Sequence, residues 1–400
     1  MVRASHVLIG LGSGLGSGVL LGGAGAPAWP VQLADLIGGL WLDGLRMTIV
    51  PLVFLLIVTG IGSAARAGGQ GIARRAAPLF FGLLLGSAIV GALLGSLLLA
   101  AWPPIAAGSI GSPDPAAQLP QLPPAGAVLR NLIPANPVAA AAEGAIVPLT
   151  VFAVLFGLAL SRLPAEQRIA ADVLDGALAA MLAIVRWVLL LAPAGVFSLA
   201  LGAASRLGLG LGSALLGYVA VQVGVTLVLA AGMSGAAMLA NVRLSAFARA
   251  AAPAQAIAFS TQSSLASLPA MLSGCARLGL DPAHTGALLP LAVAVFRIAA
   301  PASIVIVTLT LARLNNVEIP LPQLALVILL AMLNTLVIAG LPNQITFFAA
   351  YAPPALAAGV PIELLPLMLA IDTVPDMFYT VSNVTADMSV AALAAPRGAD

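Results

Sequence analysis

Apolar runs long enough to cross a bilayer alternate with short polar segments along much of the chain. They cover about residues 6–24, 46–63, 78–101, 173–200, 208–240 and 286–310. A further apolar region, 126–161, is interrupted by N-L-I-P-A-N-P, whose two prolines exclude a continuous helix. The pattern predicts an all-α polytopic membrane protein built as one integral domain.

After residue 246 some of the apolar runs become short and paired. One pair surrounds F-S-T-Q-S-S-L-A-S-L-P at 259–269, and the other surrounds A-G-L-P-N-Q at 339–344. Each run is too short to cross a hydrocarbon core of about 30 Å, so each pair predicts a re-entrant hairpin whose tip stops near the midplane. Each predicted hairpin is followed by a longer helix, and two such units are expected of an inverted-repeat transporter.

The last apolar run, 360–393, carries a stripe of polar side chains. At about 100° per residue these positions share a strip about 80° wide. The stripe consists of Asp372, Asp376, Thr380, Asn383 and Asp387. An Asp at bilayer depth costs about 2.5–3.5 kcal/mol, so three on one face indicate bound cations, protons or a basic partner. One alternative is a surface helix whose polar face is solvated. Another is that Asp372 and Asp387 lie near opposite membrane boundaries, but Asp376 would then still lie near the middle of the membrane.

Two further features lie at the depth of this stripe. Arg297 occupies the middle of the run at 286–310, and its guanidinium must face a cavity or pair with an acid of the stripe. Ser263 and Ser264 occupy the first hairpin tip, where the N–H groups of a helix N-terminus can bind a carboxylate. A structural ion pair and an ordinary serine-rich turn are the respective alternatives.

The composition narrows the class of protein. Hydrophobic residues make up 61% of the chain, charged residues 8%, and the mean hydropathy is +1.11, which excludes an ordinary soluble domain. The 16 basic residues, all arginine, only slightly outnumber the 14 acids, so nucleic acid is not an expected partner. Cys275 is the lone cysteine, and no His or Lys is predicted near the tip serines. We therefore expect no enzyme, no zinc site and no cofactor.

The basic residues also predict the orientation of the chain. Three connections carry them, at Arg66, Arg74 and Arg75, at Arg162 and Arg168, and at Arg243 and Arg249. The positive-inside rule places these connections in the cytoplasm, whereas 102–125 carries no basic residue and is predicted outside. The first run superficially resembles a secretory signal, but a chain this apolar needs it as an anchor. We expect a multi-pass inner-membrane protein with both termini cytoplasmic.

Several motifs, in the same order, resemble those of the dicarboxylate/amino acid:cation symporter family, the glutamate-transporter-like group. M-T-I-V-P-L-V-F resembles its second helix, I-P-A-N-P-V with F-A-V-L-F-G-L-A-L its fourth region, and L-A-P-A-G-V-F-S-L the end of its fifth helix. S-S-L-A-S-L-P resembles its first hairpin tip, and D-T-V-P-D-M-F-Y-T-V-S-N-V-T-A-D its eighth helix. The resemblance covers nearly the whole chain, which is identified as a divergent member.

The resemblance implies eight transmembrane helices and two re-entrant helical hairpins, assembled as a homotrimer in lipid. Residues 1–245 would form mainly the scaffold and trimerisation region, with helices 3 and 6 joining the transport domain. Residues 246–395 would form the core transport domain, comprising both hairpins, helix 7 and helix 8. This domain would carry a small carboxylate-bearing solute across the membrane as an elevator, coupled to Na⁺ or H⁺.

The resemblance also assigns roles by position. The substrate-binding set is Ser263, Ser264, Arg297, Asp376, Tyr379, Thr380 and Asn383. The two serines would hold the substrate carboxylate, and Asp376 an amino group. Asn383 and Asp387 would form a possible Na⁺ site, and Gly340 and Pro342 of the second tip would form the gate.

Three departures from the family pattern bear on substrate and coupling. Tyr379 stands where the family has the arginine that grips an acidic side chain, and it cannot supply a charged fork. F-R-I-A-A at 296–300 replaces Asn-Met-Asp-Gly-Thr, and the third helix offers Leu83, Gly86 and Ser87 where oxygen ligands are common, so at least one sodium site is expected to be lost. Arg297 then either replaces a cation or binds a substrate carboxylate.

The favoured interpretation is a symporter for an amino acid, because Asp376 suits an ammonium group. A dicarboxylate carrier and a cation-independent exchanger remain alternatives, and an anion channel or a serine hydrolase is remote. A channel would need a continuous polar path, whereas the sequence shows one localised acidic cluster and two closed tips.

Overall fold

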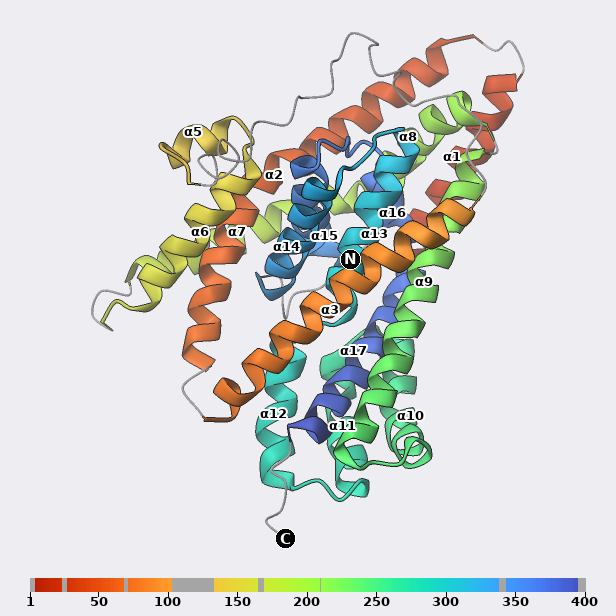
Figure 1. Ribbon diagram of the computed structural model, residues 1–400. Helices are drawn as coiled ribbons and strands as arrows, with labels where there is room; N and C mark the ends of the chain where they lie inside the picture. Colours follow the sequence, from red (N-terminus) through yellow and green to blue (C-terminus); the bar gives the residue numbers. More distant parts are fainter. Residues whose placement is uncertain are drawn as a thin grey trace.

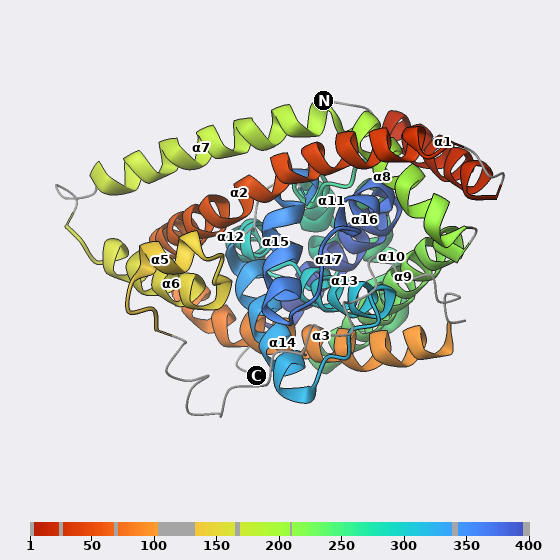
Figure 2. The same ribbon diagram turned by 90° about the horizontal axis from the view of Figure 1, so that it is seen from above.

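The computed structural model describes residues 4–23, 27–67, 71–102, 133–164, 169–208, 210–337 and 343–394. Within these ranges the chain forms α-helices, one short 3₁₀ helix and their connections, with no strand. The predicted outside loop at 102–125 lies outside the described residues except for Trp102. Figures 1 and 2 show the arrangement from two perpendicular directions.

One group of helices lies along a single side of the molecule. It consists of α1 (Ala4–Gly23), α2 (Trp29–Ala67), α5 (Pro137–Ala142), α6 (Ile146–Ser161), α7 (Ile169–Leu190) and α8 (Ala192–Leu207). The long helix α2 packs against α6, α7 and α8, and α1 packs against α8. In Figure 2, α1, α2, α7 and α8 run along one edge of the central helices. We call this set the outer group.

Glycines let α1 approach α8 closely. Gly10, Gly14, Gly18 and Gly22 recur every fourth residue, which places them on one face of the helix. A Cβ atom at any of the four would lie 2.4 or 2.5 Å from a carbonyl oxygen of α8, whereas a Cβ at Gly12 or Gly16 would meet nothing within 4 Å. The four-residue period therefore fixes which face of α1 is the contact face, as small residues commonly do between membrane helices.

The centre of the molecule contains two helical hairpins. The first is α10 (Leu244–Thr261) with α11 (Ser264–Arg277), and the second is α14 (Leu321–Val337) with α15 (Asn343–Ala357). The helices of each hairpin pack against each other, and each has 18 residues or fewer, short of the about 20 needed to span a bilayer. The second tip, which contains Gly340 and Pro342, lies outside the described residues.

The span predicted at 286–310 lies within a stretch that is long and apolar enough to cross a membrane, but its helix is interrupted. Helix α12 (Pro282–Val295) ends before Phe296, and α13 (Ala299–Leu314) begins three residues later. Two causes are visible. Pro301 lacks the N–H that would bond the Arg297 carbonyl, and the Ala299 N–H is accepted instead by the side-chain oxygen of Asn383 at 3.0 Å. The break leaves Arg297 between two helices rather than inside one.

Other predicted boundaries need correction as well. The predicted span at 173–200 is two helices, because Pro193 in the first turn of α8 cannot continue the hydrogen bonding of α7. Helix α2 begins at Trp29 rather than near residue 46, and the last run divides into α16 (Leu365–Ile371) and α17 (Thr373–Leu393). The interruption predicted at N-L-I-P-A-N-P agrees with the described part of that motif, since 133–136 are not helical and α5 begins at Pro137. A second break, which was not predicted, separates α5 from α6 at Gly144 (φ 66°).

Helices α3 (Gly71–Ala101) and α9 (Gly210–Ala236) cover the opposite side of the central helices. Both pack against α13, and α9 also packs against α17. A Cβ at Gly91 of α3 would lie 2.6 Å from the Cα of Ala302, so that glycine permits the closest approach of α3 to α13. In Figure 2 the central helices lie between this side and the outer group.

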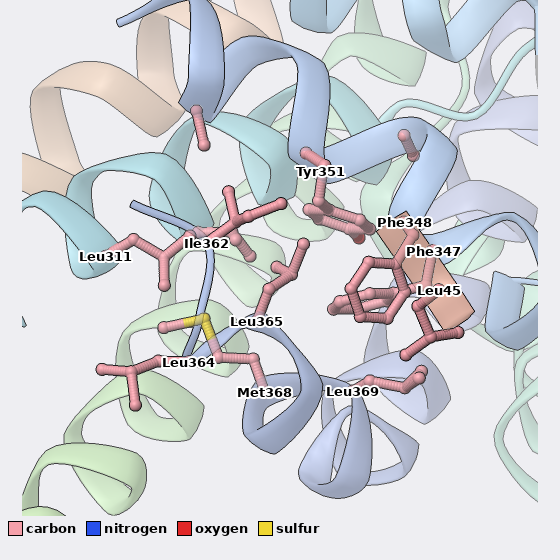
Figure 3. Close-up of a cluster of buried hydrophobic side chains, with 14 of the residues drawn as sticks. Leu45, Leu311, Phe347, Phe348, Tyr351, Ile362, Leu364, Leu365, Met368 and Leu369 are labelled. Atoms are coloured by element: carbon pink, nitrogen blue, oxygen red, sulfur yellow. The ribbon is translucent and has the colours of Figure 1, made fainter. Parts of the chain in front are cut away.

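Among the described residues, the central helices contact the outer group through apolar side chains and one ion pair. Figure 3 shows Leu45 of α2 in a buried cluster with Phe347 and Phe348 of α15, near residues of α16. Arg46 of α2 also lies 2.6 Å from Glu363, which precedes α16, and their side chains are 37% and 48% exposed. The interface is therefore mainly apolar, with a partly solvated salt bridge at its edge.

Several helices are suited to a lipid environment. Five described stretches are long and apolar enough to cross a membrane: Trp29–Gly60, Ala77–Ala101, Ile169–Leu190, Gly210–Ala240 and Pro282–Leu314. Large apolar side chains of α7 are exposed, including Val173 at 65% and Trp187 at 66%. Such a surface is stable against acyl chains but not in water, so the fold is that of a multi-pass membrane protein. The number of crossings stays a prediction.

Candidate functional site

The tip of the first hairpin is held against the start of α17. Gln262 adopts a left-handed conformation (φ 54°), which turns the chain from α10 into α11. Its side-chain nitrogen donates a hydrogen bond to the Thr373 carbonyl oxygen at 2.8 Å. Ser263 caps α11, with its hydroxyl accepting the Ala266 N–H at 3.2 Å, and Ser264 begins the helix. The two predicted serines therefore lie at a helix N-terminus next to the acidic helix.

The polar stripe of α17 faces the protein interior. Asp372, Thr380, Asn383 and Asp387 are each 4% exposed or less, and Asp376 is half-buried. On the other side of the helix, Val374 is 41% exposed. The sequence prediction of an inward acidic face is confirmed, and the alternative of a solvated polar face is wrong.

Arg297 lies near the stripe because of the break between α12 and α13. Its guanidinium interacts electrostatically with the Asp376 carboxylate, and both side chains are half-buried. This agrees with the expectation that a guanidinium at membrane depth associates with an acid of α17. One arginine and one carboxylate, both half-buried, can together bind the opposite charges of a zwitterion.

Asn383 and Asp387 lie one helical turn apart on the buried face of α17. The Asn383 oxygen accepts the first N–H of α13, so this side chain anchors the start of that helix. Asp387 is 1% exposed, and neither of its carboxylate oxygens has a hydrogen-bond partner among the described residues. A buried carboxylate with no donor is costly unless a cation or proton neutralises it.

The donor set around Asp387 fits a monovalent cation better than a transition metal. Within the described ranges, no group of three or more His, Cys, Asp or Glu side chains could hold a metal ion. A lone carboxylate one helical turn from an amide side chain offers oxygen ligands and one negative charge, which suits a hard singly charged ion such as Na⁺.

Tyr379 is more deeply buried than its position beside the polar stripe had suggested. Its side chain is 4% exposed, and its hydroxyl accepts a hydrogen bond from Ser303 of α13 at 3.0 Å. The same serine hydroxyl bonds Tyr351 at 2.9 Å and the Gln222 amide at 3.3 Å. A direct role of Tyr379 in substrate binding stays a prediction, as do the roles of the other assigned residues.

Sequence reasoning missed the partners of Tyr379. Tyr218 and Gln222 lie in an otherwise apolar run, and both are fully buried. Polar side chains at bilayer depth are functional candidates by default, so these two residues carried a usable signal. Ser303 and Tyr351 carried no such signal, because single hydroxyl groups are common in membrane helices.

Short helical hairpins, interrupted helices and a buried acidic stripe together define the class of this protein. Irregular backbone at membrane depth is tolerated where it lines a protein cavity, and half-helix ends that point at a central site are characteristic of secondary transporters. The class is therefore that of a helical membrane transporter. More specifically, the chain belongs to the sodium:dicarboxylate symporter family, whose family model matches residues 4–396.

Curated relatives agree with this membership. The chain is 26% identical over 353 residues to the C4-dicarboxylate transport protein of Rhodospirillum rubrum, which covers 84% of this chain and 76% of that protein. It is 25% identical over 397 residues to the proton/sodium-glutamate symport protein of Bacillus subtilis, covering 96% and 89%. It is 26% identical over 377 residues to the proton/glutamate-aspartate symporter of Escherichia coli, covering 88% and 83%. The family is one of transport proteins that move dicarboxylates or acidic amino acids.

Proposed function

We propose that this protein is a secondary symporter that moves a small carboxylate-bearing solute, preferentially an amino acid, with Na⁺ or H⁺ as coupling ion. The observation that carries the proposal is the bond from Gln262 to Thr373, which holds the tip of hairpin 1 against α17. The N-terminus of α11 and the acidic stripe are thereby neighbours. A positive helix end beside a carboxylate is a site for a molecule that carries both charges.

The roles of the binding residues follow from their chemistry. Ser263, Ser264 and the free N–H groups of α11 bind the substrate carboxylate, and Asp376 binds its ammonium group. Arg297 receives a second carboxylate in this proposal, which is supported by its electrostatic interaction with Asp376. Thr380 and Asn383 contact the remaining polar atoms of the substrate.

Coupling is proposed at Asp387. Its two buried oxygens have no hydrogen-bond donor among the described residues, so a cation bound there removes an electrostatic penalty. Because Asn383 is assigned to both the substrate site and the cation site, the ligand that binds first orders a side chain that the second ligand also uses, so each favours the other. This reciprocal effect is the thermodynamic basis of symport.

We propose an elevator mechanism in a homotrimer of the inner membrane, with both termini cytoplasmic. The outer group supplies the scaffold, and α10 to α17 move with α3 and α9, which pack on α13. The apolar contact between α2 and α15 in Figure 3 supports this division, because apolar surfaces can slide without losing directional bonds. The second hairpin, with Gly340 and Pro342, is the proposed gate.

Uptake into proteoliposomes tests the proposal. We expect saturable counterflow of a labelled acidic amino acid that is strongly reduced by Ser264→Ala. The matched control is Ser260→Ala, because the Ser260 hydroxyl bonds only carbonyls of its own helix in the described structure. Conductive flux without counterflow, or equal uptake by both variants, would contradict a carrier with its site at the tip of hairpin 1.

A dicarboxylate is the second candidate substrate, favoured by the position of Arg297 and by the C4-dicarboxylate relatives. Thermal unfolding of the purified protein separates the two, since a ligand at 100 times its dissociation constant stabilises by about 2.7 kcal/mol. An increase in melting temperature with succinate but not with aspartate would favour the dicarboxylate.

A further inference from the structure

Arg297 lies between two apolar neighbours that are buried far more deeply than it is. Phe296 is 0% exposed and Ile298 is 2% exposed, whereas Arg297 is half-buried. The three residues form the connection between α12 and α13, which is not helical. Because no regular helix sets the direction of these side chains, the contacts of Phe296 and Ile298 must do so.

The backbone of Phe296 separates its own side chain from that of Arg297. Phe296 has an extended conformation, with φ −105° and ψ 99°. In extended backbone, successive side chains point to opposite sides of the chain. The guanidinium of Arg297 is therefore directed away from the side on which the Phe296 ring is buried, and the position of that ring decides where Arg297 points.

Phe80 of α3 holds the Phe296 ring in place. The two ring centroids lie 4.7 Å apart, and the ring planes differ by 12°. Phe80 is itself only 6% exposed, and both rings belong to one buried cluster that also contains Ile298. A stacked pair of buried rings has a preferred geometry as well as buried area, so Phe296 cannot turn without losing both.

Helix α3 is in turn fixed against α13, which makes Phe80 a firm support. Gly91 and Gly95 follow Phe80 on the same side of α3, since 11 residues make close to three helical turns. A Cβ atom at Gly91 would lie 2.6 Å from the Cα of Ala302, and one at Gly95 would lie 3.0 Å from Cγ1 of Ile306. Figure 1 shows α3 running obliquely past α12 and α13, and it packs against both.

The other end of the connection is fixed by α17. The side-chain oxygen of Asn383 accepts the N–H of Ala299 at 3.0 Å, immediately after Ile298. Arg297 thus lies between an aromatic anchor from α3 and a polar anchor from α17. Its guanidinium interacts electrostatically with the Asp376 carboxylate, on the same helix as the polar anchor.

We propose that Phe80 is a positioning residue for Arg297. Through its stack on Phe296 it keeps the guanidinium beside Asp376, where the proposed function has Arg297 receive the second carboxylate of a solute. Phe80 thereby favours solutes with two carboxylates over solutes with one, although it belongs to α3 and is outside the binding set. The effect on solute preference rests on the proposed function, whereas the effect on the position of Arg297 does not.

Ordinary packing of two aromatic rings is the alternative. It predicts that removing either ring lowers the stability of the protein, but it predicts no change in how Arg297 and Asp376 act on each other. A leucine at position 80 remains apolar but offers no flat face, so Phe80→Leu separates the two explanations. Phe80→Met is the second variant, because the flexible methionine side chain fills irregular gaps in a core.

Thermal unfolding of the purified full chain tests the positioning without any transport. Arg297→Gln and Asp376→Asn are made singly and together, and the non-additive part of their effects measures the interaction of the two side chains. We expect this non-additive part to fall to less than about half when the same cycle is measured in Phe80→Leu or Phe80→Met.

The matched control is Phe54→Leu. Phe54 stacks on Phe152, also with ring planes 12° apart, but this pair joins α2 and α6 of the outer group. We expect the control to leave the interaction of Arg297 with Asp376 unchanged. An undiminished interaction in both variants of Phe80, or an equal reduction in Phe54→Leu, would overturn the proposal.

Uptake into proteoliposomes tests the effect on solute preference. Phe80→Leu should raise the KM for L-aspartate by about 2- to 12-fold, the equivalent of one stacked aromatic pair, and keep the maximal rate. Inhibition of this uptake by L-alanine should not weaken, because alanine has no second carboxylate. An unchanged KM for L-aspartate, or an equal loss for both solutes, would refute the role in preference. If the unmodified protein takes up no solute while Phe80→Leu still weakens the interaction of Arg297 with Asp376, the transport function fails and the positioning stands.

Discussion

The glycine face of α1 allows a stability prediction with a matched control. The perturbation is Gly14→Ala combined with Gly18→Ala, two sites where a new Cβ would lie 2.4 Å from the carbonyl oxygens of Phe197 and Leu201. Ordinary contact begins at 3.4 Å, so α1 must move away from α8 by about 1 Å. Such a gap forfeits a quarter to a half of each dispersion contact along the interface.

The expected cost is about 1–3 kcal/mol per overpacked site, hence about 2–6 kcal/mol for the pair. Replacing glycine by alanine inside a helix also stabilises by about 0.5–1 kcal/mol. The control variant, Gly12→Ala with Gly16→Ala, gains the same helix propensity but meets no atom within 4 Å. The difference between the two double variants therefore isolates the packing of α1 against α8.

Unfolding in mixed micelles with increasing SDS, followed by tryptophan fluorescence, measures this difference. We expect the variant altered at Gly14 and Gly18 to unfold at a lower SDS fraction than the protein altered at Gly12 and Gly16. Equal midpoints would show that α1 and α8 do not meet along this face, and the helix pairing described here would then be wrong.

Three further predictions concern charge and capping. Asp387→Asn should weaken the apparent sodium affinity at least tenfold, or about 1.4 kcal/mol, as measured by uptake against sodium concentration. An unchanged affinity would show that the sodium ion binds at another site. Arg297→Gln should lower the temperature of thermal unfolding, because it leaves the Asp376 charge without its arginine. Adding Asp376→Asn should recover part of this loss, since a lone buried charge costs more than a neutral pair. Additive losses in the double variant would contradict an interaction between the two side chains. Asp281→Ala should lower the free energy of unfolding by about 1 kcal/mol, since its oxygens cap α12 at 3.1 and 3.2 Å, and an unchanged unfolding midpoint would argue against that cap.

Much of the fold was predictable because its signals are local. The described residues of N-L-I-P-A-N-P before Pro137 are not helical, as its prolines predicted, and the short paired runs gave the paired helices of both hairpins within the described residues. The break at Phe296 was not predicted, because F-R-I-A-A contains neither glycine nor proline. Pro301 was an available signal, since proline is favoured in the first turn of a helix. The decisive contact, from Asn383 to Ala299, joins residues 84 positions apart.

The site was predictable to the extent that its residues share one helix. Asp376, Asn383 and Asp387 follow a helical period, which the sequence displays directly. The partners of Tyr379 follow no such period, because Tyr218 and Tyr379 come together only through the packing of α9 against α17. Periodicity identifies the face of one helix, but it cannot identify which distant helix covers that face.

The salt bridge between Arg46 and Glu363 also has a dynamic consequence. It connects α2 to the segment that leads into α16, and both side chains are partly exposed to solvent. Pairs of this kind are worth about 0–1 kcal/mol, close to thermal energy at room temperature. The salt bridge is therefore a weak, reversible contact between the outer group and the central helices. Thermal motion breaks it readily, and added salt weakens it further.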